Sequence, residues 1–299
     1  MSAMLRPMYE YGIGRTPLLE LQRMNSNRIF LKLESRNYLG SIKARTAYGI
    51  VRNLNVPKDH IIVESTSGNL GLALNFFCKE EGRPFLCLLD ETVIKQKQRH
   101  LEECGVEYEM VPVVNGLDGR TSRIRRAEEL MKKEQYYWVN QYDNEEGVFI
   151  HKETTGREIF EETDGKVTSV NCAIGSGGTI AGIGEYFKSI GAKVKLVGVE
   201  PYGSTIFHTH DAPYITAGAG LRGKPGNIQK HLNVITDCLT VEDEVSVRKF
   251  RELNTLYHAD VGITTGMAYA AAQQYCRQTE NEIVVVVAPD GVEMYYEYM

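Results

Sequence analysis

Nearly continuous runs of apolar residues recur along this chain and alternate with helical patterns. The runs TSVNCAI and EIVVVVA are strand-sized and contain few polar residues. Strands of this kind are buried on both faces, as in parallel sheets covered by helices. We expect strands at residues 28–35, 60–65, 84–90, 107–112, 136–140, 168–174, 193–200 and 282–288. Amphipathic helices are expected at residues 69–81, 93–104, 119–135, 179–190 and 242–257. The alternation predicts an α/β fold with mostly parallel sheets and right-handed crossovers.

Size and charge limit the classes of function. The chain has 299 residues, 42% of them hydrophobic, enough for one or two domains. Its net charge is -5 and no basic block stands out, so we expect no nucleic-acid partner. No apolar run approaches the roughly 20 residues of a membrane span, and the first residues lack the pattern of a secretion signal. We therefore expect no membrane partner and a cytoplasmic location.

The six cysteines indicate neither a metal site nor disulfides. No two of them form a C-x-x-C pair, and no histidine cluster accompanies them. Most lie in apolar strand or helix patterns, where cysteine behaves as a small hydrophobic residue. We expect no bound metal.

Ligands of open parallel sheets bind beyond the carboxyl ends of the strands, so the loops that follow strands are the candidate sites. The first such loop, GSIKAR, carries Lys43 where a strand is followed by a helix. On its own, Lys43 is more simply interpreted as a solvated residue in the first turn of that helix. The least patterned stretch is 202–233, and a long loop inside a compact domain is usually functional.

A second loop, ESTSGNLGLAL, follows the strand at 60–65. It brings together two hydroxyls, a glycine and an amide, and then opens a helix. These residues are Thr66, Ser67, Gly68 and Asn69. The unpaired amides and partial positive charge of a helix N-terminus suit a carboxylate. An ordinary helix N-cap is the simpler alternative, but glycines on both sides of Asn69 favour a ligand.

A third loop, AIGSGGTIAG, follows the strand at 168–174. Its backbone amides can converge on a phosphate. The turn consists of Gly175, Ser176, Gly177, Gly178 and Thr179. A dinucleotide fingerprint would need glycine where Ile180 stands, although Glu200 resembles the ribose-binding acid of such sites. A phosphate cup is favoured, and an NAD-binding oxidoreductase remains as an alternative.

A reactive lysine, a carboxylate-binding loop and a phosphate cup together indicate pyridoxal 5'-phosphate and an amino-acid substrate. The chain resembles the cysteine synthase family of fold-type II pyridoxal-phosphate enzymes. The motifs that carry the resemblance occur in the family's order over nearly the whole chain. They are GRTPLLEL (14–21), GSIKAR (40–45), TSGNLG (66–71), NQYDN (140–144), GSGGT (175–179), VGVEP (197–201), GITTG (262–266) and APDG (288–291).

The resemblance implies a role for each loop. Lys43 would be the catalytic lysine that bonds to the cofactor, Asn69 would contact its ring hydroxyl, and residues 175–179 would hold its phosphate. Thr66, Ser67, Gly68, Asn69 and Gln141 would hold the substrate carboxylate. The resemblance also implies two three-layer α/β/α domains and a homodimer. Residues 37–140 would form a smaller mobile domain with the carboxylate-binding loop. Residues 1–36 plus 141–299 would form a larger domain with the phosphate cup.

The family activity that this implies is β-replacement on an O-activated L-serine, through a bound aminoacrylate. The chain departs from the family pattern at Tyr38, Ala44, Leu70 and Gly291. At the last position the family often has a serine against the pyridine nitrogen. Water, the backbone of Gly291 or the neighbouring Asp290 could take that role here.

These departures bring the chain closer to the branch that makes N-(2-amino-2-carboxyethyl)-L-glutamate from O-phosphoserine and glutamate. Arg222 is the candidate to bind the phosphate of O-phosphoserine. Our main prediction is therefore an amino-acid amine such as glutamate as the nucleophile, acting on O-phosphoserine or O-acetylserine. Sulfide, as in cysteine synthase, and a cysteine β-lyase or hydroxyl-lyase are alternatives. A non-catalytic fold kept for protein contacts is a third class.

Overall fold

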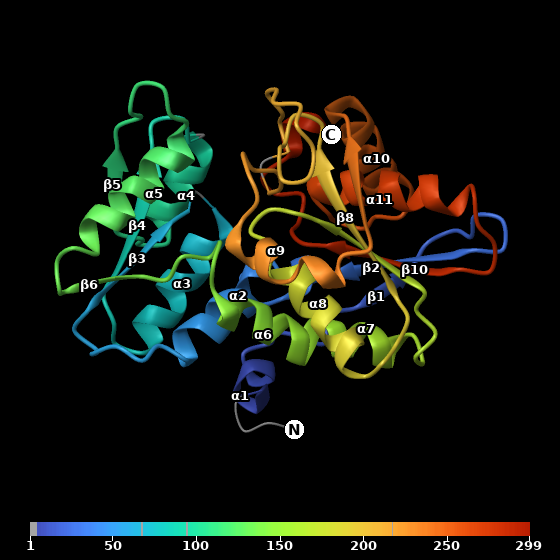
Figure 1. The fold of residues 1–299 in the computed structure, drawn as a ribbon, viewed down its shortest axis with the longest axis horizontal. Helices are drawn as coiled ribbons and strands as arrows, with labels where there is room; N and C mark the ends of the chain where they lie inside the picture. Colours follow the sequence, from blue (N-terminus) through green and yellow to red (C-terminus); the bar gives the residue numbers. More distant parts are fainter. Residues whose placement is uncertain (1–4, 67, 94, 217) are drawn as a thin grey trace.

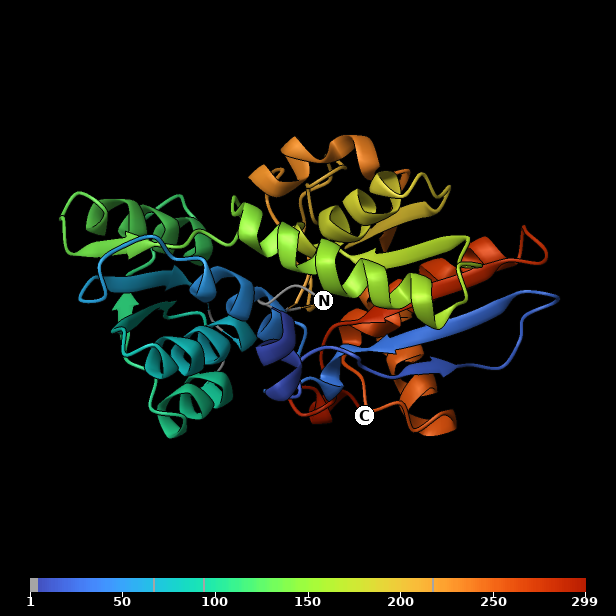
Figure 2. The same ribbon diagram turned by 90° about the horizontal axis from the view of Figure 1, so that it is seen from below.

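Two separate sheets form the framework of the molecule (Figures 1 and 2). The computed structural model describes residues 5–66, 68–93, 95–216 and 218–299. The larger sheet has the order β1-β2-β10-β7-β8-β9. Its strands are β1 (Leu18–Glu20), β2 (Arg28–Leu33), β7 (Ser169–Ala173), β8 (Lys195–Pro201), β9 (Asp237–Val241) and β10 (Ile283–Ala288). β1 pairs antiparallel to β2, and the other neighbours pair parallel.

The smaller sheet is parallel and has the order β5-β4-β3-β6. Its strands are β3 (Ile61–Ser65), β4 (Phe85–Asp90), β5 (Tyr108–Val111) and β6 (Tyr136–Trp138). Val63 and Leu88 are fully buried, and so are the residues on either side of each in its strand. Successive strand residues point to opposite faces, so both faces of this sheet are covered.

Helices cover both faces of each sheet. Apolar side chains of α7 (Arg157–Glu162) and α8 (Gly178–Ser189) cover one face of the larger sheet, and those of α10 (Asp243–Leu256) and α11 (Ile263–Cys276) cover the other. On the smaller sheet, α2 (Lys43–Arg52), α3 (Asn69–Glu80) and α4 (Lys95–Glu103) lie on one face and α5 (Gly119–Leu130) on the other. The predicted α/β class with two three-layer units is confirmed.

The remaining elements are short. They are α1 (Leu5–Glu10), α6 (Glu145–His151), α9 (Gly226–Lys230), a π-helical turn (Lys152–Gly156), and three 3₁₀ turns (Glu34–Arg36, Leu232–Val234, Tyr296–Tyr298). All eight expected strands are present, each end within two residues of its expected place. The edge strands β1 and β9 were not expected, because one is only three residues long and the other is partly exposed and not uniformly apolar.

Helix α11 was also not among the expected amphipathic helices. It is buried on nearly all sides, because it lies between the larger sheet and α10. A helix in that position needs no polar face, and its sequence therefore carries little helical periodicity.

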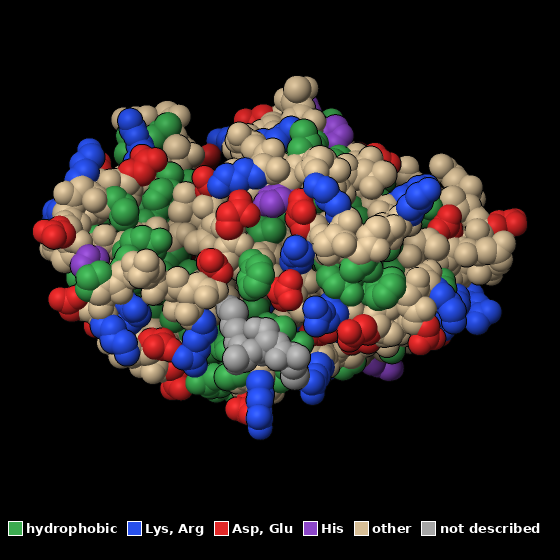
Figure 3. All heavy atoms as spheres, turned by 60° about the horizontal axis from the view of Figure 1, so that its bottom comes forward, with side chains coloured by type: hydrophobic (Ala, Val, Ile, Leu, Met, Phe, Trp, Pro, Cys, Tyr) green, Lys and Arg blue, Asp and Glu red, His purple; other side chains and the backbone are tan. Residues whose placement is uncertain are grey.

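The unpatterned stretch 202–233 contains only α9 and a 3₁₀ turn within its described residues. On the face seen in Figure 3, cationic and anionic side chains are interspersed.

No helix in the described part of the chain is long and apolar enough to cross a membrane. The predicted domain boundaries at residues 37 and 140, and the mobility of the smaller part, stay predictions.

Candidate active site

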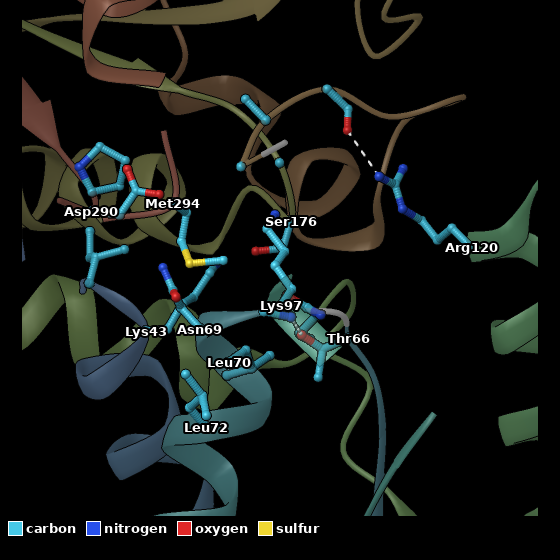
Figure 4. A pocket seen from close by; sticks show the side chains of 18 of the residues that line it. Lys43, Thr66, Asn69, Leu70, Leu72, Lys97, Arg120, Ser176, Asp290 and Met294 are labelled. Atoms are coloured by element: carbon cyan, nitrogen blue, oxygen red, sulfur yellow. Dashed lines mark hydrogen bonds between the residues drawn. The ribbon is translucent and has the colours of Figure 1, made fainter. Parts of the chain in front are cut away.

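The cavity that contains Lys43 lies where loops from both sheets meet (Figure 4). In the larger sheet, β2, β10 and β7 are neighbours, and the segments that follow their carboxyl ends all reach the cavity. The smaller sheet contributes the loop after β3. From these four segments the cavity is lined by Ile42, Lys43, Pro289, Asp290, Gly175, Ser176, Thr66, Gly68 and Asn69, and Gln141 lies beside them.

Lys43 is held at the first position of α2. The amide of Ile42 donates to the carbonyl of Pro289 at 2.8 Å, which ties the start of this helix to the end of β10. Burial lowers the pKa of the Lys43 amine, while Asp290 and Glu64 act in the opposite direction. The amine forms no hydrogen bond or ion pair with a described residue, so it is free to react.

The loop between β3 and α3 offers donors to an anion. Asn69 is the first residue of α3, and the amides of Asn69 and Leu70 donate to no described residue. Gln141 lies against this loop, with its Nε2 donating to the carbonyl of Ser65 at 3.2 Å. Free amides at this place are suited to a carboxylate, and the predicted role of the loop stays a prediction. Ser67, a predicted member, lies outside the described residues.

The glycine turn after β7 is a second place with free amides. None of the amides of residues 175–179 donates to a described residue, and α8 begins within the turn at Gly178. Gly177 has a φ of 84°, and a Cβ there would lie 2.5 Å from Cγ1 of Ile228. A side chain at Gly175 would lie 3.1 Å from the carbonyl oxygen of Gly218. The turn is therefore built from glycine to expose its backbone, which suits a phosphate.

A buried histidine lies behind this turn. Nε2 of His151 is 3.4 Å from Oγ1 of Thr179 and 3.1 Å from Oγ1 of Thr46, and Nδ1 is 2.9 Å from Oγ1 of Thr155. Burial and the nearby cations Arg45 and Lys43 hold the pKa of His151 well below its usual range. The neutral ring therefore connects the glycine turn to the helix that carries Lys43.

Asp290 follows β10 and borders the cavity. Its Oδ2 accepts a hydrogen bond from the hydroxyl of Tyr295 at 3.0 Å. Its Oδ1 is buried and has no partner among the described residues. Burial raises the pKa of Asp290 to about 6, although Tyr295 and two lysines act against this.

Besides Lys43, three cationic residues line the cavity, and the sequence motifs indicated none of them. Arg123 is paired with Asp90 at 2.9 Å, whereas Lys97 on α4 and Arg120 on α5 have no ion-pair partner among the described residues. Arg120 donates to the carbonyl of Gly220 at 3.4 Å, and Figure 4 marks this hydrogen bond with a dashed line. Lys97 has no hydrogen bond or ion pair with a described residue. Lysine and arginine recur along the expected helices, so no local sequence pattern distinguished Lys97 and Arg120 from the other cations.

Arg222 does not line the cavity of Lys43. Its side chain is exposed and forms ion pairs with Asp211 at 3.1 Å and Asp118 at 3.6 Å. It borders a neighbouring depression that also contains Lys97 and Arg120. Its predicted contact with a substrate phosphate stays a prediction.

Residues 9–290 match the model of a protein family described as pyridoxal-phosphate dependent enzyme. The chain belongs to this family. It is also 31% identical to the cysteine synthase of Haemophilus influenzae over 302 residues, which covers 95% of this chain and 94% of that one. The predicted membership of the cysteine synthase family of pyridoxal-phosphate enzymes is therefore confirmed, and so is the predicted cofactor.

Two solved structures have the same fold. One is a hydrogen sulfide-producing enzyme from Fusobacterium nucleatum, with a TM-score of 0.87, 26% identity, and 99% of this chain and 98% of that chain covered. The other is an O-acetyl serine sulfhydrylase, isoform 3, from Entamoeba histolytica, with a TM-score of 0.87 and 26% identity. That match covers 99% of this chain and 90% of the other.

The groups around the cavity fit pyridoxal phosphate. The cofactor carries an aldehyde, an anionic phosphate, a ring hydroxyl and a ring nitrogen. The cavity offers a free amine in Lys43, unpaired amides in the glycine turn, the amide side chain of Asn69 and the unpartnered oxygen of Asp290. Each polar group of the cofactor has a chemically suited candidate on the chain.

Proposed function

We propose that this chain catalyses β-replacement on an O-activated L-serine, with sulfide as the nucleophile and L-cysteine as the product. Sulfide as the nucleophile is one of the alternatives that the sequence leaves open. It takes precedence over an amino-acid amine because relatives named cysteine synthase and O-acetyl serine sulfhydrylase match over nearly their whole length. The observation that carries the proposal is the unpaired amine of Lys43 in a cavity between two sets of free backbone amides.

The chain's own residues divide the work of binding. Lys43 would hold the cofactor, with residues 175–179 on its phosphate and Asn69 on its ring hydroxyl. When bound, the cofactor withdraws electrons from the α-carbon of the substrate, so that the α-proton and the group on Cβ can leave. Thr66, Gln141 and the amides at the start of α3 would hold the substrate carboxylate.

Lys43 is also suited to move a proton. Once released from the cofactor, its amine would lie within reach of the α-proton of the bound amino acid. Because burial lowers its pKa, a larger fraction of the amine is neutral near pH 7, and a neutral amine can act as a base.

The two anion-binding loops belong to different sheets. The carboxylate loop follows β3 of the smaller sheet, and the glycine turn follows β7 of the larger one. A cofactor held by the glycine turn and a substrate held by the carboxylate loop would together bridge the two sheets, which would favour closure of the predicted mobile part, residues 37–140. Closure would exclude water from the reacting atoms.

The activity is tested by giving the cofactor-loaded protein O-acetylserine or O-phosphoserine with sulfide, and identifying the product by mass spectrometry. We expect L-cysteine from at least one of the two. In Lys43→Ala we expect turnover to fall by at least about 100-fold, the usual scale for a positioned acid or base. Borohydride should fix the cofactor mass on the peptide that contains Lys43. Lys58→Ala, at an exposed lysine, is the matched control and should retain activity. No L-cysteine from either serine ester would overturn the proposal.

The second candidate is β-replacement on O-phosphoserine with an amino-acid amine such as glutamate. Lys97 and Arg120 favour it, because two cations at the cavity are well matched to an anionic leaving group or to a nucleophile with carboxylates. Arg120→Met and Lys97→Met should raise KM for O-phosphoserine by about 10-fold, the scale of one charge-assisted hydrogen bond, and leave KM for O-acetylserine nearly unchanged. Equal effects on both esters would contradict an anion-specific role.

A further inference from the structure

We propose that Glu64 is a positioning residue that controls whether the side chain of Gln141 can donate to the substrate carboxylate, and that Glu64 takes up a proton when the carboxylate binds. Glu64 lies on β3 outside the cavity lining, so it would act through Gln141, which lines the cavity. The inference rests on the proposed carboxylate-binding loop, and on neither the leaving group nor the nucleophile of the proposed function.

The side chain of Gln141 has both of its N–H groups in use. Its Nε2 donates to the carbonyl oxygen of Ser65 at 3.2 Å and to Oε1 of Glu64 at 3.4 Å. An amide side chain has two N–H donors, and a carboxylate is an acceptor only. Gln141 can therefore bind a carboxylate through its side chain only after it releases at least one of these two hydrogen bonds.

The contacts of Glu64 allow this release. The backbone amide of Gln141 donates to Oε2 of Glu64 at 3.1 Å, and this bond does not depend on where the Gln141 side chain points. The bond from Nε2 to Oε1 is longer, and its acceptor carries the charge of Glu64 when the carboxyl group is ionised. Because a hydrogen bond to an ionised acceptor is stronger than one to a neutral acceptor, protonation of Glu64 weakens its hold on Nε2.

Glu64 has no counter-charge that would keep it ionised. Its side chain is fully buried and forms no ion pair with a described residue. The titratable groups that face it are Cys87 of the neighbouring strand β4, Tyr142 of the segment after β6, and Lys43 of α2. Burial raises the pKa of Cys87 to about 12 and also raises that of Tyr142, so both are neutral near pH 7. Lys43 would carry the cofactor.

A bound carboxylate would shift the charge of Glu64. Burial already raises the pKa of Glu64 to about 7, although donors from Gln141 act against this. The proposed carboxylate loop begins at Thr66, directly after β3, and a second negative charge there raises the pKa of Glu64 further. The turn of the Gln141 side chain towards the substrate removes one of the opposing donors and acts in the same direction. By linkage, a proton on Glu64 then strengthens binding of the carboxylate.

The direct test is infrared difference spectroscopy of the cofactor-loaded protein at pH 8, with L-serine as the probe. L-Serine has the amino-acid carboxylate but no activated leaving group, and the absorbance of the cofactor reports that it is bound. We expect binding to produce the C=O band of a newly protonated carboxyl group, and the band should shift when the protein contains glutamate labelled with carbon-13. Absence of this band in the wild type overturns the proposal by itself, whether or not any variant folds.

The pH dependence of affinity gives a second readout. Glu64→Gln keeps an acceptor at this position but takes up no proton, and Glu134→Gln, at an exposed glutamate, is the matched control. The dissociation constant of L-serine is measured at pH 7 and pH 9 from the absorbance of the cofactor. Between these values the wild type should lose up to about 10-fold more affinity per pH unit than Glu64→Gln, and Glu134→Gln should follow the wild type.

A purely structural role of Glu64 predicts a different result. If Glu64 only held the loop together, Glu64→Gln would change the affinity for L-serine by the same factor at both pH values. A ratio of the wild-type to the variant dissociation constant that does not change with pH would therefore overturn the proposal. Because neither an activated serine nor a nucleophile is present, failure of the proposed β-replacement activity would leave both measurements interpretable.

Discussion

The guanidinium group of Arg45 donates from Nε to Oε2 of Glu34 at 2.7 Å, and neither side chain is exposed to solvent. Arg45 also donates to both carboxyl oxygens of Glu158 at 2.7 Å. Lys32 completes the cluster, with its amine 3.0 Å from Glu158. The cluster joins the helix that carries Lys43 to the end of β2 and to α7, and so fixes Lys43 relative to the larger sheet.

Arg45→Met should destabilise the protein strongly. Removal of Arg45 leaves Glu34 and Glu158 buried without their main counter-charge, and breaking a buried pair in this way costs about 3–5 kcal/mol. The free energy of unfolding from urea titration measures the loss. Arg6→Met removes an exposed partner of Glu10 and is the control, with an expected change below about 1 kcal/mol. Similar losses of unfolding free energy in the two variants would show that the buried cluster contributes no more than an exposed ion pair.

Glu64 should make the apoprotein less stable as the pH rises. Burial raises the pKa of Glu64 to about 7, although Gln141 and other donors act against this. The folded state therefore keeps a proton that the unfolded state has lost, and stability falls between about pH 4.5 and about pH 7. With about 1.4 kcal/mol per pKa unit, the loss is up to about 3 kcal/mol. Glu64→Gln should be flatter than the wild type in unfolding measured across this range. An unchanged pH slope in the variant would contradict the assignment.

His151, in contrast to Glu64, should make the protein less stable as the pH falls. Because its pKa is held well below its usual range, the unfolded state binds a proton that the folded state does not, and stability falls as the pH drops below about 6.5. His151→Gln should lose this acid-side dependence in urea unfolding at pH 7.5 and 5.5. Since the ring also contacts Thr179, cofactor release should become several-fold faster. Slow release as in the wild type would mean that His151 does not support the glycine turn.

Gly177 and Gly191 form a matched pair for the glycine turn. Both have positive φ, 84° and 67°, but a Cβ at Gly191 meets no atom within 4 Å, whereas one at Gly177 meets the buried Ile228. Both alanine variants should lose about 1–3 kcal/mol from backbone strain. Gly177→Ala should also weaken cofactor binding by at least about 10-fold, measured by absorbance after dialysis. If Gly191→Ala releases the cofactor equally, general destabilisation explains both.

The candidate site residues that could be predicted from the sequence are those that lie within one short, local motif. Asn69 and the turn at 175–179 stand in short motifs directly after apolar strands, and Lys43 opens the first α-helix that follows β2. The ends of these strands determine where the motifs lie. Lys97 and Arg120 reach the cavity through the packing of α4 and α5, which no local pattern records. The unpartnered oxygen of Asp290 likewise depends on contacts between distant segments.

The arrangement of β2, β10 and β7 has a consequence for synthesis of the protein. β10 hydrogen-bonds to β2 across about 250 residues of intervening chain, and the loop after it completes the cavity. Until β10 has been synthesised, β2 and β7 cannot be joined through it, and the place between them stays empty. Assembly of the cofactor-binding centre therefore has to wait for β10, and the nascent larger sheet is exposed to wrong edge-to-edge pairing until this strand arrives.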